Sequence, residues 1–322
     1  KFETGRNFAN KVWNAGRFLL MNLSERPLPA TVTAVSLDPA TLGFPERWIL
    51  DRLAQAIGEC TASLEAFHFN DYANGAYRFF RDDLCDWYLE WAKRQFKAGG
   101  AEAVIAGRVL SFCFDQVLRL LHPGMPHLTE YLWQHLQTTA GGMAWAGRHL
   151  MTEPWPEPVG HHANAAIGAQ MVALQAVVVA VRNARNLLQL GDGIQLAAII
   201  HAPDAGERSL IEANRDFVIN RANLLSLDIS SSGTKPPASV STAVGALKIH
   251  IPVSGVADVA KLTEQLTKRV SGLEKSIAGK AARLTNADFI ARAPAAQVEE
   301  TRALAAKEQV ELDNVRETLL GL

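Results

Sequence analysis

Hydrophobic and polar residues recur with a helical period over most of the chain, and the first 23 residues show this most clearly. The apolar stripe there is Phe8, Val12, Ala15 and Leu19, spaced by four, three and four residues, which predicts an amphipathic helix over Lys1–Leu23. Trp13 and Phe18 lie at the borders of the stripe. The opposite half of the helix is polar and consists of Arg6, Asn7, Asn10, Lys11, Asn14 and Arg17.

This polar half is a candidate RNA-binding face. Three of its residues are asparagines, which are poor helix formers in helix interiors but present a donor and an acceptor suited to base edges. Its charge is also one-sided, because Lys1, Arg6, Lys11 and Arg17 stand against Glu3 alone. The alternative is an ordinary solvated face, since every surface helix carries polar residues on one side.

Four further helices are predicted before residue 152. The second contains Trp48, Leu53, Ile57 and Leu64, and the third runs from about Asn70 to Lys97 with aromatic residues that we interpret as core. The fourth spans Ala101–Leu121, and a turn containing His122 and His127 leads into the fifth, through Leu132 and Trp133. Short connections between these helices predict an antiparallel bundle over residues 1–152. We expect the two histidines to have turn and capping roles.

A proline-rich linker at 154–158 opens a second region, residues 153–255, with a different texture. We expect a helix over Asn164–Leu190, a strand over Ile194–His201 and a helix over Leu210–Ala222. Three further strands are expected at Leu224–Ile229, Val240–Val244 and Leu247–Val253, with a turn loop over Ser230–Pro237. This pattern predicts a small α/β module within a mainly α protein.

The last region, residues 256–322, predicts an antiparallel coiled-coil hairpin. Apolar residues recur every three or four positions from Leu262 to Leu284, and every seven from Val298 to Leu319, with a break at Thr285–Pro294. The first arm is basic and the second acidic. Opposite charges could pair across the hairpin, or the basic arm could contact a phosphate backbone, and the sequence leaves both open.

Composition limits the class of protein. The 322 residues are 48% hydrophobic and 20% charged with a formal net charge of −1, so a nucleic-acid site must be a local patch. The three widely spaced cysteines, Cys60, Cys85 and Cys113, predict buried reduced thiols, no metal site and a cytoplasmic protein. No uninterrupted apolar run has membrane-spanning length, so we expect no membrane segment. The chain begins with Lys inside a helical pattern, which favours part of a longer protein.

Several blocks resemble a known enzyme family. The segments GRNFANKVWNAGRFLL, FNDYANGAYRFFRDDLCDWYLEWAK and LLHPGMPHLTEYLW, with Trp155-Pro156, resemble the part of class I valyl-tRNA synthetases that follows the catalytic domain. The C-terminal LEKSIAGKAARLTNADFIARAPAAQVEETRA resembles the terminal arm of the bacterial enzymes. Gly124 and His127 stand where the family usually has bulky aromatic residues.

The resemblance implies an anticodon-binding helical bundle of the class I type, a linker module and a coiled coil that packs on the outer corner of tRNA(Val). Under it, the anticodon-binding residues are Arg6, Asn7, Asn10, Lys11, Asn14, Arg17 and Phe18, with Trp13 as a second stacking candidate. The corner-binding residues are Lys268, Lys275, Arg283, Asn286, Phe289 and Arg292.

The resemblance also implies that this chain positions tRNA and does not catalyse. The HIGH-like and KMSKS-like motifs of the family, and its editing pocket, do not occur here. ATP and Mg are therefore expected to serve the parent valine–tRNA ligase through its N-terminal catalytic and editing domains, and this chain alone is expected to be inactive, with no cofactor of its own. The alternatives are the corresponding part of an isoleucyl- or leucyl-tRNA synthetase, or a coiled-coil scaffold that binds protein without RNA. An isoleucyl enzyme predicts a terminal zinc-binding cysteine cluster, and no cysteine follows Cys113.

Overall fold

The computed structural model describes residues 2–25, 37, 39–139, 149–158, 165–188, 190, 193–253, 259–286 and 295–320. It contains two compact units, Lys1–Val172 and Ala173–Leu322. The predicted division of the whole chain into residues 1–152, 153–255 and 256–322 stays a prediction.

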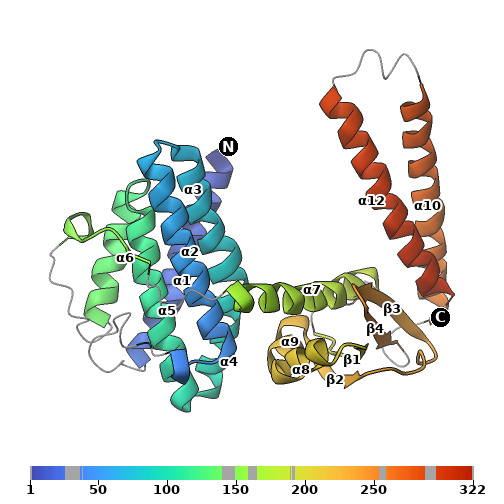
Figure 1. Cartoon of the computed structure of the whole chain (residues 1–322), viewed down its shortest axis with the longest axis horizontal. Helices are drawn as coiled ribbons and strands as arrows, with labels where there is room; N and C mark the ends of the chain where they lie inside the picture. The colour runs from blue at the N-terminus through green and yellow to red at the C-terminus, as the bar shows by residue number, and fades with distance from the viewer. Residues whose placement is uncertain are drawn as a thin grey trace. The chain divides into compact units, whose positions relative to one another are not determined.

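The first unit is a bundle of long helices (Figure 1). Its elements are α1 (Phe2–Glu25), η2 (Pro39–Thr41), α2 (Phe44–Glu65), α3 (Phe69–Arg78), η3 (Phe79–Leu89), α4 (Glu90–Ala98), α5 (Gly100–Leu121), α6 (Pro126–Thr139) and η4 (Leu150–Thr152). The five predicted helices are confirmed. The predicted stripe of α1 faces the core, since Val12, Ala15 and Leu19 are buried.

The third predicted helix is continuous through α3, η3 and α4, but its winding differs from the expected one. Residues Phe79–Leu89 form a π-helix. Buried residues there come in adjacent pairs, Phe79/Phe80, Leu84/Cys85 and Tyr88/Leu89, at intervals of four to five residues. That interval is wider than the 3.6-residue period of an α-helix, and a π-helix, with its i to i+5 hydrogen bonds, keeps all three pairs on one side. The aromatic core is confirmed for Tyr72, Phe79, Phe80 and Tyr88, whose rings are buried. Tyr77, Trp87 and Trp91 of the same helix are half-buried.

α1 lies unusually close to two neighbouring helices at Gly16. A Cβ atom placed there would lie 2.8 Å from Leu132 Cδ2 and 3.1 Å from Phe114 Cζ. The glycine thus allows α1 to lie directly against α5 and α6, because any larger residue would displace those side chains. The turn before α6 is fixed by His122, whose Nδ1 lies 2.8 Å from Thr129 Oγ1, as its expected turn role requires.

The second unit contains a four-stranded sheet with strand order β2-β1-β4-β3. Its strands and helices are β1 (Leu196–His201), α8 (Ala205–Ala213), α9 (Arg215–Ala222), β2 (Leu224–Ser230), β3 (Ser239–Val244) and β4 (Leu247–Pro252). β1 and β2 are parallel and joined by α8 and α9, while β4 is antiparallel to both β1 and β3. The predicted α/β module is confirmed.

The single helix expected over Leu210–Ala222 is wrong. The helical region starts earlier, where Asp204 accepts a hydrogen bond from the Glu207 backbone N–H at 2.8 Å and caps α8. It is interrupted at Asn214, whose side-chain Nδ2 donates to the Leu210 carbonyl at 2.9 Å. Asparagine side chains compete for backbone groups in this way, and α9 starts as a new helix.

The boundary between the units falls within α7 (Ala165–Leu187). Contrary to expectation, residues Ala166–Leu187 are long and apolar enough, with a mean hydropathy of 1.4, to cross a membrane by length and composition. A core helix meets the same criterion, and Val177, Val178 and Val181 are buried.

The predicted hairpin is formed by α10 (Val259–Thr285) and α12 (Ala295–Leu319), which lie side by side (Figure 1). Leu266, Leu273, Leu312 and Val315 are buried in it. α12 also packs on β3, so the hairpin is not buried by its two arms alone.

Candidate nucleic-acid interface

The predicted polar face of α1 is exposed along its length. Arg6, Asn7, Asn10, Asn14 and Arg17 are all exposed, while Lys11 and Phe18 are half-buried. The other side of α1 packs against α5 and α6, so these side chains lie together on the outer side of the helix. The structure therefore keeps the predicted set together on one side of α1.

Two members of this face are held by neighbouring elements. Lys11 Nζ lies 2.7 Å from Asp86 Oδ1, so its charge is partly neutralised. The Phe18 ring packs edge-on against Phe96 of α4, with the ring centroids 5.8 Å apart. Arg17 forms no ion pair with any residue that the structure describes. Arg17 is therefore the cation of this face best placed to contact phosphate.

Sequence reasoning missed a basic extension of the face on α4. Lys93 Nζ lies 5.7 Å from the centroid of the Phe18 ring, within cation–π range. Lys93 also pairs with Glu90 at 2.5 Å, and Lys97, one turn further on, is exposed. The available signal was the cluster Lys93, Arg94 and Lys97. The sequence does not show that this cluster lies beside Phe18, because the approach of α4 to α1 is a tertiary contact.

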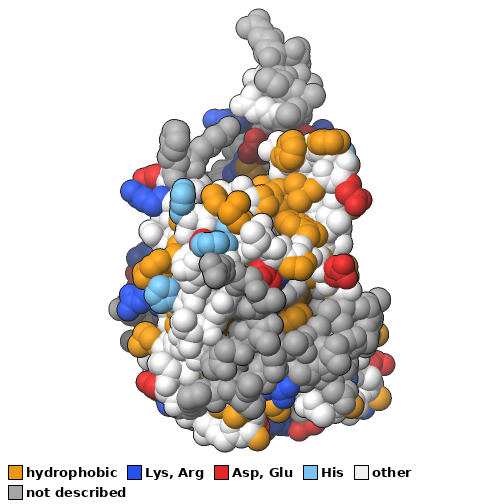
Figure 2. Space-filling view, turned by 90° about the vertical axis from the view of Figure 1, so that its left-hand side faces the viewer, with side chains coloured by type: hydrophobic (Ala, Val, Ile, Leu, Met, Phe, Trp, Pro, Cys, Tyr) orange, Lys and Arg blue, Asp and Glu red, His pale blue; other side chains and the backbone are white. Residues whose placement is uncertain are grey.

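Trp13, the second stacking candidate, points toward α6. It is 37% exposed, and its ring centroid lies 5.4 Å from that of Tyr131. Tyr131 in turn stacks on His135 at 4.2 Å. Figure 2 shows the side of the first unit that carries α6, where hydrophobic side chains gather beside histidines. Trp13 thus belongs to an aromatic row shared with α6, while Phe18 belongs to the α1–α4 side of the face.

The hairpin pairs many of its charges internally. Arg269 pairs with Glu311 at 2.6 Å, Lys280 with Glu308 at 2.8 Å and Arg316 with Glu274 at 2.6 Å, all between α10 and α12. The hydrogen bond from Lys280 lowers the pKa of the Glu308 carboxyl below its usual value. The prediction that opposite charges pair across the hairpin is confirmed for these residues.

Other basic residues of the hairpin are not used in this way. Lys268 pairs only within its own helix, with Glu264 at 2.6 Å. Lys275 and Arg283 are exposed, and neither forms an ion pair with a described residue. The backbone N–H of Asn286 donates to the Arg283 carbonyl. Phe289 and Arg292, also predicted to bind the tRNA corner, lie outside the described residues.

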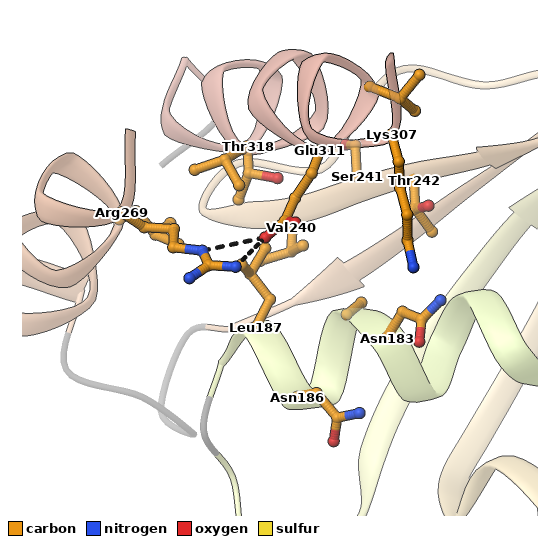
Figure 3. Close-up of a pocket in the computed structure, with 14 residues that line it drawn as sticks. Asn183, Asn186, Leu187, Val240, Ser241, Thr242, Arg269, Lys307, Glu311 and Thr318 are labelled. Atoms are coloured by element: carbon orange, nitrogen blue, oxygen red, sulfur yellow. Dashed lines mark hydrogen bonds and ion pairs between the residues drawn. The ribbon is translucent and has the colours of Figure 1, made fainter. Parts of the chain in front are cut away.

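A groove of about 760 Å³ lies in the second unit, between α7, β3 and the hairpin. Figure 3 shows the Arg269–Glu311 pair above it, with Asn183 and Asn186 of α7 along one wall. The arginines of the same α7 segment are structural. Arg182 donates to the Arg221 carbonyl and Arg185 to the Asn223 carbonyl, which attaches α7 to the start of β2.

The cysteines lie where the sequence predicts. Cys60, Cys85 and Cys113 are free and buried, and burial raises the pKa of Cys60 to about 11 and that of Cys85 to about 12. Within the described ranges, His, Cys, Asp and Glu residues form no cluster of three or more that could hold a metal ion. These thiols are therefore core residues, protonated at neutral pH.

Comparison with known proteins identifies the family. Residues 46–200 match the anticodon-binding domain of tRNA ligase, and residues 258–322 match the valyl-tRNA synthetase tRNA binding arm. The chain is 34% identical over 326 residues to the valine–tRNA ligase of Gloeobacter violaceus, covering 99% of this chain and 35% of that protein. It is 35% identical over 300 residues to that of Geobacter sulfurreducens, covering 92% and 33%.

The chain belongs to the valyl-tRNA synthetase family, as a C-terminal part. It spans about a third of the length of these relatives. The matched terminal arm favours the valyl family over the isoleucyl and leucyl alternatives. The first match begins at residue 46, after α1.

Proposed function

We propose that this chain is the tRNA-recognition part of a valine–tRNA ligase and binds tRNA(Val) at two places. The proposal is supported by the matches of residues 46–200 and 258–322 to two tRNA-recognition models. It is also supported by the exposed polar residues of α1, which precedes the first match, and of the hairpin. In the first unit, Asn7, Asn10 and Asn14 bond base edges of the anticodon loop. Arg6, Lys11 and Arg17 hold its phosphates, and Phe18 supplies a stacking surface.

In the second unit, the hairpin holds the outer corner of the tRNA. Lys275 and Arg283 are exposed without ion partners among the described residues, which suits them to phosphate contacts. Lys268 and Asn286 flank them on the same arm. Phe289 and Arg292, which lie outside the described residues, complete the proposed set of tRNA contacts.

The chemistry takes place in the part of the enzyme that this chain does not cover. There, the N-terminal catalytic domain attaches valine to tRNA with ATP and Mg, and an editing domain removes errors. This chain contributes tRNA position and anticodon selection and is inactive alone. We place its activity in the cytoplasm, where the tRNA is charged for translation.

The test compares Asn10→Ala and Asn14→Ala with the wild-type chain in binding to tRNA(Val). A good bidentate base contact discriminates by roughly 1–3 kcal/mol, so each variant should bind about 5- to 150-fold more weakly. Each should also lose preference for the valine anticodon over a substituted one. Alanine favours the helix more than asparagine does, so weaker binding would not reflect unfolding.

Asn74→Ala is the matched control, because Asn74 is an exposed asparagine within α3. It should bind like wild type. Unchanged affinity and anticodon preference in both α1 variants would remove this face from the site.

A further inference from the structure

The turn between α2 and α3 presents two aromatic side chains to solvent. Phe67 is 76% exposed and Phe69 is 63% exposed, which makes them the most exposed aromatic residues in the described part of the chain. Their rings pack edge to face, with centroids 6.4 Å apart and planes at 76°. Apolar groups arranged together in solvent are typical of interaction surfaces.

Phe67 also has an unfavourable backbone conformation. Its φ is +59°, in the left-handed region. The surrounding bonds form a Schellman motif, because the His68 N–H donates to the Ser63 carbonyl at 2.8 Å and the Phe67 N–H to the Leu64 carbonyl at 3.0 Å. Glycine usually occupies this position, since it adopts the conformation without steric cost. Folding alone therefore does not explain an aromatic residue here, and strained residues of this kind concentrate at functional sites.

The aromatic pair lies at the end of the first unit where α1 begins. α1 and the continuous helix of α3 and α4 run parallel, because Phe8 packs on Tyr77 at 4.7 Å and Phe18 packs on Phe96 at 5.8 Å. The N-terminal ends of α1 and α3 are therefore at the same end of the bundle (Figure 1). The chain matches the C-terminal part of its relatives, about 35% of the Gloeobacter protein. In an enzyme of that length, the polypeptide that precedes α1 would be joined to the bundle at this end.

The charges around the pair favour a protein partner over RNA. Glu65 is exposed, and the side chain of Asp71 is 72% exposed with His68 Nδ1 3.8 Å from its Oδ2. Carboxylates beside an aromatic pair repel phosphates, whereas the aromatic grooves that bind single-stranded RNA are basic. The complementary surface would be an apolar pocket with a basic rim.

We propose that Phe67 and Phe69 dock into an apolar, basic-rimmed pocket on the polypeptide that precedes this chain in the full-length enzyme. The docked pair couples the tRNA-recognition bundle to the catalytic part. This inference rests on the proposed function, since it takes the chain to be part of a valine–tRNA ligase.

The first experiment is hydroxyl-radical labelling, without RNA, of the 322-residue chain and of the full-length enzyme that contains it. Phe67 and Phe69 should be labelled at least 5-fold less in the full-length enzyme. Met151, which is 75% exposed beside α6, is the comparison site within the same unit. Equal labelling of the two phenylalanines in both proteins would overturn the inference.

The second experiment replaces Phe67 with glycine. Phe67→Gly relieves the left-handed strain, so the 322-residue chain should melt at the same or a higher temperature and bind tRNA(Val) unchanged. In the full-length enzyme, the same variant should lower kcat/KM for valyl-tRNA formation about 10-fold. Phe67→Asn should behave like Phe67→Gly, because asparagine tolerates the conformation but lacks the ring, and Phe67→Tyr should retain activity.

A wild-type kcat/KM in full-length enzymes carrying Phe67→Gly or Phe67→Asn would contradict the proposed coupling of the bundle to the catalytic part. The docking proposal and the proposed tRNA-binding function can be distinguished by which measurement fails. Loss of the proposed function appears as failure of the 322-residue chain to bind tRNA, whereas failure of docking leaves that binding intact.

Discussion

Replacing Lys275 and Arg283 with glutamine removes the two cations of α10 that are exposed and lack ion partners among the described residues. If both residues contact tRNA phosphates, each should contribute to the slope of log affinity against log salt. The contribution is about 0.9 for a phosphate in a duplex and about 0.7 for one in a single strand. The double variant should therefore flatten the slope by about 1.4–1.8. Between 50 and 200 mM salt, the wild type should lose about 7- to 12-fold more affinity than the variant.

The assay is equilibrium binding of tRNA(Val) to the purified chain, by fluorescence anisotropy, at four or more salt concentrations. Both substituted residues are on the surface, so the free energy of unfolding should change by less than about 0.5 kcal/mol. Folding should be confirmed by thermal melting of each variant.

The control is Lys280→Gln combined with Glu308→Gln. These residues pair at 2.8 Å between the two helices, so their joint replacement removes one cation without changing net charge. Because the pair is internal to the hairpin, this control should keep the wild-type slope. A Lys275→Gln/Arg283→Gln variant that folds normally and keeps the wild-type slope would refute the assignment of these residues to phosphate contacts.

Three further predictions test the first unit. Gly16→Ala should lower the free energy of unfolding by up to about 2 kcal/mol in a denaturant melt, because crowding of Leu132 and Phe114 outweighs the gain in helix propensity; equal or greater stability would contradict the close approach. Burial raises the pKa of Glu46, so ionisation of its carboxyl destabilises the folded state increasingly as pH rises from about 4.5. Glu46→Gln should therefore change the free energy of unfolding more favourably at pH 7 than at pH 4.5. An effect of the substitution that does not depend on pH would contradict this. Lys93→Gln should weaken tRNA(Val) binding and reduce the slope of log affinity against log salt, and an unchanged slope would exclude Lys93 from the interface.

Helices with a regular apolar stripe on one side were predictable from the sequence. In α1, Val12 and Leu19 recur at helical spacing and are buried, so the exposed half follows from geometry alone. The π-helical segment is not predictable from apolar residues alone, because adjacent apolar residues such as Phe79 and Phe80 are equally compatible with the core of an α-helical bundle. The break between α8 and α9 depends on one side chain, Asn214, that bonds its own helix backbone.

The candidate site was predictable where it lies on a single helix and not where it depends on tertiary contacts. The α1 residues share a face by helical period. Lys93 joins them only because α4 packs beside Phe18. On the hairpin, the arms could be assigned opposite charge. However, which cations pair, such as Lys280, and which stay exposed, such as Lys275, depends on the register of the two helices.

The most direct test of the central claim is binding of the purified 322-residue chain to tRNA(Val) at low ionic strength, against the same tRNA with a substituted anticodon. The account predicts measurable binding, weaker for the substituted tRNA, and no formation of valyl-tRNA when valine, ATP and Mg are supplied. Absence of binding, or valyl-tRNA formation by this chain alone, would contradict it.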